Sequence, residues 1–174
     1  MMKGLLSDYR VIFIDLDGTL VNTASGARFP KTEHDWMPKL EMYEALKKNK
    51  PNFIHIVTNQ ANIKRGIVNE ERWNWKAEYI RKCLEAYTGA KVTYDYCPDN
   101  DRANPDRKPN PGMFSSYRDL YKKMTGRDLD PEECLMIGDA SGKPGQFSDS
   151  DKKFAENCGI DYMDAADYIK HQNP

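Results

Sequence analysis

The expected fold is decided by one stretch of sequence, Val11-Ile12-Phe13-Ile14-Asp15-Leu16-Asp17-Gly18-Thr19-Leu20. Its first four residues are apolar and mostly β-branched, which favours a strand that is covered on both faces, as in a parallel sheet. Two acids follow one residue apart, and Gly18 ends the apolar run. Because open parallel sheets bind ligands just beyond the carboxyl ends of their strands, we expect Asp15 and Asp17 at that edge, close enough to share a cation.

Strand-like and helical segments alternate along the rest of the chain. Further strands are predicted at residues 53–57, 92–97, 133–137 and 160–163, and helices at 38–49, 69–89, 113–126, 148–157 and 165–169. Residues 21–37 show no period and are expected to form a surface loop or short flap. The alternation predicts an α/β fold, a doubly wound and mostly parallel Rossmann-like sheet flanked by helices, with residues 1–174 forming a single capless domain.

The composition narrows the classes of function. The chain has 174 residues, of which 39% are hydrophobic, and this is the size of one domain with a proper core. Its net charge of −1 provides no overall attraction to nucleic acid or to anionic membranes, so any such binding must be local. No apolar run approaches the roughly 20 residues of a membrane span, and residues 1–8 are too short and too soon charged for a signal peptide. We therefore expect a cytoplasmic protein with no membrane partner.

The cysteines, His55 and Trp75 have ordinary structural explanations in the sequence. The four cysteines are widely spaced and are expected to be reduced core thiols, which together with three distant histidines argues against a structural zinc site. His55 lies within an apolar strand, where a backbone group is expected to satisfy it, so it is left out of the site. Trp75 falls off the apolar stripe of its helix, and a half-exposed aromatic, a partner contact and a base-stacking platform all remain open.

Chemically active side chains stand at or near the ends of successive expected strands, namely Asp15, Asp17, Thr58, Lys108, Asp139 and Asp151. Phosphoryl transfer needs positioning and charge compensation, and these residue types supply both. Asp15 is expected to be the nucleophile, forming an aspartyl-phosphate. Asp17 is expected to protonate the leaving oxygen and then to deprotonate the attacking water.

A magnesium ion is the expected cofactor of this cluster. Asp15 and Asp139 would hold it, with the backbone carbonyl of Asp17, while Asp151 either supports the site indirectly or only caps a helix. The ion is needed because crowded carboxylates repel one another, which raises their pKa values. Lys108 would neutralise the nucleophile and the phosphate, although a solvated surface lysine is the open alternative. Thr58 and the backbone amides after Asp15 would bind phosphate oxygens.

The set resembles, in order, the four motifs of the haloacid dehalogenase superfamily, over residues 11–160. Within its capless group the chain is similar to the 3′-phosphatase domain of polynucleotide kinase/phosphatase. The similar stretches are Ser25-Gly26, Phe29-Pro30, Asp35-Trp36, Thr58-Asn59-Gln60 with Arg65-Gly66, and Gly138-Asp139-Ala140-Ser141-Gly142-Lys143-Pro144 with Phe147-Ser148 and Asp151. The Gly138 to Pro144 string is the most discriminating of them.

The resemblance implies a Mg²⁺-dependent phosphatase that removes a terminal 3′-phosphate from DNA or RNA. It implies substrate-binding roles for Leu16, Gly18, Thr19, Ser25, Gly26, Asn59, Gln60, Arg65 and Lys143. Affinity for the strand would come from a local basic patch, Arg28, Lys31, Lys64, Arg65, Arg102, Arg107 and Lys143. The chain lacks the Gly-x-x-x-x-Gly-Lys-(Ser/Thr) motif, so 5′-phosphorylation is not expected, and a separately encoded ligase or kinase could act beside it. The oligomeric state is not indicated.

Two other functions remain open. The first is a small-molecule phosphatase of the histidinol-phosphate or heptose-bisphosphate type. Relatives of that type often carry a zinc loop with several cysteines, of which this chain retains Cys97 alone. The second is a non-catalytic module that binds phosphate ends, although such a module would have no reason to retain both Asp15 and Asp17.

Overall fold

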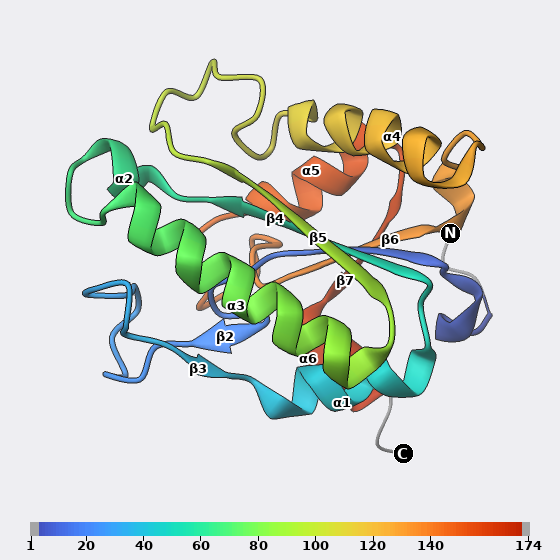
Figure 1. Ribbon diagram of the computed structural model, residues 1–174, viewed down its shortest axis with the longest axis horizontal. Helices are drawn as coiled ribbons and strands as arrows, with labels where there is room; N and C mark the ends of the chain where they lie inside the picture. The colour runs from blue at the N-terminus through green and yellow to red at the C-terminus, as the bar shows by residue number, and fades with distance from the viewer. Residues whose placement is uncertain (1–3, 172–174) are drawn as a thin grey trace.

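A parallel five-stranded sheet forms the centre of the molecule (Figure 1). The computed structural model describes residues 4–171, so part of the stretch on which the signal-peptide expectation rests lies outside it. The strands are β1 (Val11–Ile14), β4 (Phe53–Asn59), β5 (Lys91–Cys97), β6 (Cys134–Gly138) and β7 (Asp161–Asp164), in the order β5-β4-β1-β6-β7. Each neighbouring pair is parallel, which confirms the predicted α/β fold.

The central strand β1 explains the uninterrupted apolar run of the sequence. Its four residues are all buried, because β4 and β6 flank it and helices cover both faces of the sheet. Ile12 and Ile14 pack into the core cluster that also holds buried residues of α1, α3 and α6. Val11 and Phe13 point the other way and pack into the cluster shared with α4 and α5. A strand with two buried faces has no use for alternating polar residues.

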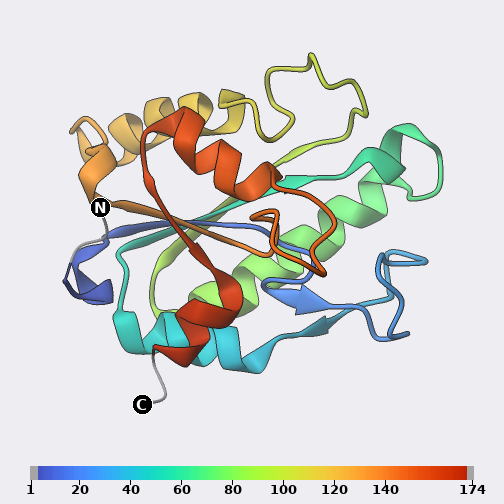
Figure 2. The same ribbon diagram turned by 180° about the vertical axis from the view of Figure 1, so that it is seen from behind.

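The helices lie in two layers on either side of the sheet (Figures 1 and 2). One layer holds α1 (Leu40–Asn49), α3 (Glu70–Thr88) and α6 (Ala165–Lys170), and the other holds α4 (Gly112–Thr125) and α5 (Ser150–Cys158). The shorter elements are α2 (Ala61–Lys64) and the 3-10 turns η1 (Leu6–Asp8) and η2 (Pro131–Glu133). As predicted, α3 starts after Asn69, whose side chain accepts a hydrogen bond from the Arg72 amide.

Residues 21–37 contain more order than the sequence predicts. The two short strands β2 (Val21–Asn22) and β3 (Met37–Pro38) pair in antiparallel fashion and enclose the loop 23–36. Pro38 therefore belongs to a strand, and the prediction that it opens a helix is wrong because α1 begins at Leu40. The strand β4 also runs two residues beyond its predicted end, through Thr58 and Asn59, because both pair with β5.

Several side chains differ from their predicted environments. His55 is hydrogen-bonded through Nδ1 to the Thr93 hydroxyl, not to a backbone group. All four cysteines are free, but two of them, Cys83 in α3 and Cys158 in α5, are only half-buried. Trp75 is 67% exposed, which is more than the half exposure expected. Within residues 4–171, no helix is both long and apolar enough to cross a bilayer.

Candidate active site

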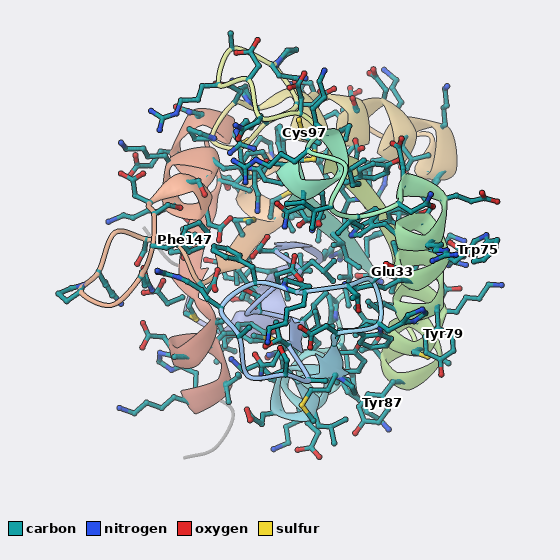
Figure 3. The ribbon with its side chains drawn as sticks, turned by 90° about the vertical axis from the view of Figure 1, so that its left-hand side faces the viewer. Glu33, Trp75, Tyr79, Tyr87, Cys97 and Phe147 are labelled. Atoms are coloured by element: carbon teal, nitrogen blue, oxygen red, sulfur yellow. The ribbon has the colours of Figure 1, made fainter. Side chains whose placement is uncertain are left out.

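The loops that follow β1, β4, β5 and β6 meet at one end of the molecule, the carboxyl edge of the sheet (Figure 1). Figure 3 looks onto this end, with Phe147 on one side, Trp75 and Tyr79 on the other, and Glu33 between them. Asp15 directly follows β1, Asp139 directly follows β6, and Thr58 is the last residue but one of β4. Parallel strands bring these distant residues together, as the sequence predicts.

Lys108 is buried at the centre of the acidic residues. Its Nζ lies 2.8 Å from Oδ1 of Asp15 and 2.7 Å from Oδ1 of Asp151. The residue is only 4% exposed, so the alternative of a solvated surface lysine is wrong. A single ammonium group therefore joins the end of β1 to the start of α5.

Asn59 holds the backbone of Lys108 in place. Its Nδ2 donates to the Lys108 carbonyl at 3.0 Å, and its Oδ1 accepts from the Lys108 amide at 2.9 Å. Both ends of this side chain are thus engaged within the protein. The structure gives Asn59 a positioning contact, and the substrate contact that the resemblance implied stays a prediction.

Three carboxylates form a compact cluster around this ammonium. Asp15, Asp139 and Asp151 each place one oxygen within 4.8 Å of the others. Asp151 lies inside α5 and is buried, and its Oδ2 accepts from the Asp139 amide at 3.2 Å. The alternative that it only caps the helix is therefore wrong. Gly138 allows this approach, because a Cβ there would overlap the Asp151 carboxylate.

The buried cluster shifts the ionisation of its members. Burial raises the pKa of Asp15 to about 6, and it does the same for Asp139 and Asp151, helped by the neighbouring carboxylates. Burial alone would lower the pKa of Lys108, but the carboxylates of Asp15 and Asp151 outweigh it and raise that pKa. One cation therefore faces three acids, and the site lacks positive charge.

The residues present fit a divalent cation. Oδ1 of Asp139 is buried, and no hydrogen-bond donor among residues 4–171 reaches it. An orphaned carboxylate oxygen in an acidic cluster is a ready ligand for a hard cation such as Mg²⁺. The carboxylate of Asp17 stands outside the three-acid cluster, so a contribution from Asp17 would have to come from its backbone carbonyl, as the sequence suggested.

Asp17 is oriented by a glutamine. The side-chain amide of Gln60 donates at 2.9 Å both to Oδ2 of Asp17 and to the hydroxyl of Thr58. Both Thr58 and Gln60 are buried. The Gln60 side chain therefore fixes the position of Asp17, the acid–base candidate, relative to Thr58, the phosphate-binding candidate.

A pocket of about 290 Å³ opens beside Asp17, between the turn after β1 and the loop 23–36. Gly18, Gly26 and Arg28 line it, among others. The guanidinium of Arg28 lies 5.3 Å from the ring centre of Phe147, which comes from the loop after β6. This places one member of the predicted basic patch at the mouth of the site.

Other predicted substrate residues are buried or have partners within the protein. The side chains of Leu16 and Thr19 are fully buried, so only their backbone could meet a ligand. Both the amide and the hydroxyl of Ser25 donate to the carboxylate of Asp35 at 2.7 Å. The remaining two also have contacts within the protein. Arg65, which directly follows α2, contacts Asn62 within that helix, and Lys143 is paired with Asp164 and Asp167.

Three residues near the site were given no role from the sequence, and one of them, Asp35, was named only as part of a stretch similar to the family. Asp35 organises the loop 23–36, and Asp164 holds the loop after β6 through Ser141 and Lys143. Neither leaves a periodic signal, because each works through loop backbone and distant partners. Lys76 is different, because it is 8% exposed on the buried side of α3. A lysine three residues after Trp73 interrupts an apolar helical stripe, and that interruption could have identified it.

Comparison with known proteins places these residues in context. The model of the polynucleotide kinase 3 phosphatase family matches residues 10–168. The chain is 33% identical over 160 residues to the bifunctional polynucleotide phosphatase/kinase of Schizosaccharomyces pombe, covering 88% of this chain and 36% of that protein. It is 30% identical over 169 residues to an uncharacterized 20.8 kDa protein of Autographa californica nuclear polyhedrosis virus, covering 92% of this chain and 86% of the viral one.

A solved structure shares the fold. The D,D-heptose 1,7-bisphosphate phosphatase of B. bronchiseptica, determined with magnesium and phosphate, matches with a TM-score of 0.61 and 21% identity. The match covers 94% of this chain and 97% of that one.

Proposed function

Because the chain belongs to the polynucleotide kinase 3 phosphatase family, within the haloacid dehalogenase phosphatases, we propose that it removes a terminal 3′-phosphate from DNA or RNA. The observation that carries the proposal is the family match over residues 10–168, which includes every member of the acidic cluster and Lys108. The 33% identity to a polynucleotide phosphatase/kinase supports the choice of a nucleic-acid end.

The reaction would begin at Asp15. Its Oδ1 accepts from Lys108, which leaves the other carboxylate oxygen to attack phosphorus and form an aspartyl-phosphate. The bond from phosphorus to the 3′-oxygen breaks, and that oxygen takes a proton from Asp17 to become a hydroxyl. In the second half, Asp17 takes a proton from water as the water oxygen attacks phosphorus. The bond between the Asp15 oxygen and phosphorus breaks, inorganic phosphate leaves, Asp15 is again a carboxylate and Asp17 is again protonated.

Charge on the transferred group would be balanced by fixed donors. Lys108 supplies a buried cation beside the nucleophile, and the Thr58 hydroxyl and the amides after Asp15 supply hydrogen bonds. Mg²⁺, when held by Asp15 and Asp139, would add the positive charge that the cluster lacks. Gln60 accounts for the orientation of Asp17, because a donor to Oδ2 leaves Oδ1 to handle the proton.

A small-molecule substrate is the second candidate. The fold is shared with a D,D-heptose 1,7-bisphosphate phosphatase, and the pocket of about 290 Å³ could also admit a sugar phosphate. A nucleic-acid end is preferred because the family match is more specific than a shared fold. The proposal extends to nucleic-acid ends as the partner, to a separately encoded ligase or kinase acting beside it, and to the cytoplasm as the compartment.

Phosphate release from three substrates separates the candidates. We expect a 3′-phosphorylated oligonucleotide to give a kcat/KM at least about a hundredfold above histidinol phosphate and heptose 1,7-bisphosphate with Mg²⁺ present. An Asp15→Asn variant is the control for contaminating phosphatases, and it should fold normally and release no phosphate. A preference for either metabolite would reject the nucleic-acid proposal, and full activity of the variant would reject Asp15 as nucleophile.

A further inference from the structure

A second pocket, of about 320 Å³, lies on the outer side of α3 and is separate from the pocket beside Asp17. Its walls are aromatic and charged, and include Glu33, Trp36, Arg72, Trp75, Lys76 and Tyr79. This volume falls in the lower part of the range for ligand pockets, about 300 to 1,000 Å³. The mechanism proposed above uses none of these residues.

The aromatic side chains are presented to solvent. Trp75 is 67% exposed and Tyr79 is 60% exposed, and their spacing of four places them on one face of the helix. Tyr79 meets Trp36 of the loop 23–36 in a T-shaped contact, with ring centres 6.0 Å apart. Figure 3 shows Trp75 and Tyr79 projecting from the flank of α3, beside the carboxyl edge of the sheet. Large exposed rings at a pocket mark a binding surface more often than single scattered ones.

The pocket also contains two cationic side chains, Arg72 and Lys76. The Arg72 guanidinium pairs with Glu33 at 3.1 Å, which ties α3 to the loop 23–36. Lys76 is nearly buried, and no residue within 4–171 forms a hydrogen bond or ion pair with it. The carboxylates of Asp17, Asp35 and Glu33 lie within electrostatic range of Lys76 but form no direct contact with its ammonium, so this cation has room for a further partner. An anionic ligand would complement it.

The pocket adjoins the catalytic acid. Burial lowers the pKa of Lys76, and the carboxylate of Asp17 acts on that pKa in the opposite direction, so the two side chains lie within electrostatic range of each other. The loop 23–36 lines both pockets, with Arg28 in one and Glu33 and Trp36 in the other. A strand whose 3′ end lies at Asp15 could therefore continue past Lys76 onto α3.

We propose that this α3 pocket holds an upstream nucleobase of the substrate strand, stacked on Trp75 and Tyr79, while Lys76 faces the adjoining phosphate. The inference rests on the proposed function and adds a specificity site to it. An unpaired base combines an aromatic face with an anionic backbone, and this matches rings beside an unpaired cation. The pocket would thus favour single-stranded ends of several nucleotides over mononucleotides.

Kinetics with shortened and abasic substrates test the inference. The substrates are a 3′-phosphorylated single-stranded hexanucleotide, the same strand with one abasic position at a time, and a nucleoside 3′-monophosphate. For the wild type we expect one upstream abasic position to raise KM about tenfold, because stacking of one base contributes an effect of this order. In a Trp75→Ala/Tyr79→Ala variant, KM for the intact hexanucleotide should rise about tenfold, with kcat unchanged and the abasic effect lost.

Two further variants guard against a purely structural effect. Trp75→Phe keeps a stacking ring and should retain most of the hexanucleotide affinity. Tyr87→Ala removes an exposed ring of the same helix that packs on Tyr43 outside the pocket, and it should leave KM unchanged. Activity on the nucleoside 3′-monophosphate should be the same in all four proteins.

The outcomes are distinguishable. If the wild type hydrolyses the hexanucleotide but the double variant keeps its KM, the pocket inference is wrong and the proposed function stands, and the exposed rings would then suit a protein partner. An equal loss on the monophosphate would also reject the inference, because the effect would be general. If the wild type prefers metabolite phosphates over the hexanucleotide, the proposed function and the inference fail together.

Discussion

Asn59 and Lys108, 49 residues apart in sequence, exchange two hydrogen bonds between a side-chain amide and a peptide backbone. Asn59 is the last residue of β4, and Lys108 lies in the long loop after β5. The pair fixes the loop at the one residue whose ammonium reaches both Asp15 and Asp151. The position of Lys108 is thus fixed by a residue at the end of a rigid strand, and not only by the loop that contains Lys108.

Replacing Asn59 by alanine should lower kcat on every substrate by about 10- to 100-fold, because a shift of about 1 Å in a catalytic group can cost this much. KM should change little, since both polar atoms of the Asn59 side chain are engaged within the protein. Asn157→Ala is the matched control, because Asn157 donates to the carbonyl of Pro109, the next residue, from an exposed position. A rise in KM with unchanged kcat would support the substrate-binding role that the resemblance implied.

The sequence predicted the sheet well and the partners of loop residues poorly. Apolar runs of four or five residues identify buried strands, and the polar residue after each run marks the carboxyl edge, which is why Asp15, Thr58 and Asp139 were found together. A polar residue at that edge can face a ligand or a neighbouring loop, and no local pattern separates the two. The resemblance implied substrate roles for Asn59 and Lys143, and the structure shows that both also contact distant protein groups.

Gly18 should be far less tolerant of substitution than other glycines of the same backbone shape. Its φ is +80°, and a Cβ there would overlap the carboxylate of Asp139. Gly89 has a φ of +77° with open space around it, so Gly89→Ala is a control for backbone strain alone. Each alanine should cost about 1 kcal/mol of stability from that strain.

Gly18→Ala alone should also lose most of its activity and its response to Mg²⁺, because the Asp139 carboxylate must move. Urea unfolding and phosphate release on the two variants measure both effects. Equal activity of the two variants would show that the close approach of Gly18 to Asp139 does not affect phosphate release.

His55 should make the protein less stable in mild acid. Burial lowers its pKa to about 3, whereas in the unfolded chain it titrates near about 6.5. Below about pH 6.5, His55 is protonated in the unfolded chain but stays neutral in the folded protein. The free energy of unfolding therefore decreases as the pH falls toward 3.

A His55→Gln variant removes this loss. The stability gap between wild type and variant should therefore shrink by about 2 kcal/mol between pH 7 and pH 5, at about 1.36 kcal/mol per unit below 6.5. Urea unfolding of both proteins across this range gives the gap directly, and other titrating groups cancel in the difference. A gap that stays constant with pH would mean that His55 binds its proton equally well in the folded and unfolded states, so folding would not lower its pKa.

Magnesium should stabilise the protein more at pH 7.5 than at pH 5. The pKa values of Asp15, Asp139 and Asp151 are raised to about 6, so these acids hold protons at pH 5 and offer few charges to a cation. Without metal, their contribution to stability is present below the unfolded value of about 4 and is lost as the pH rises through 6. Between about pH 4 and pH 6 the three acids outweigh the opposite effect of the single His55, so metal-free protein should melt at a lower temperature as the pH rises through this range, and Mg²⁺ should reverse that loss.

The size of the effect follows from linkage. At about ten times its Kd, Mg²⁺ should raise Tm by roughly 3 to 6 °C at pH 7.5, from RT ln(1 + [L]/Kd) and the usual entropy of unfolding for this size. Asp139→Asn should remove most of this shift, because the variant replaces the carboxylate whose Oδ1 lacks a partner among residues 4–171. Asp128→Asn, on an exposed acid paired with Lys122, should keep it. A shift that is equal at both pH values and survives Asp139→Asn would place the cation elsewhere, since an ion held by this cluster must compete with its protons.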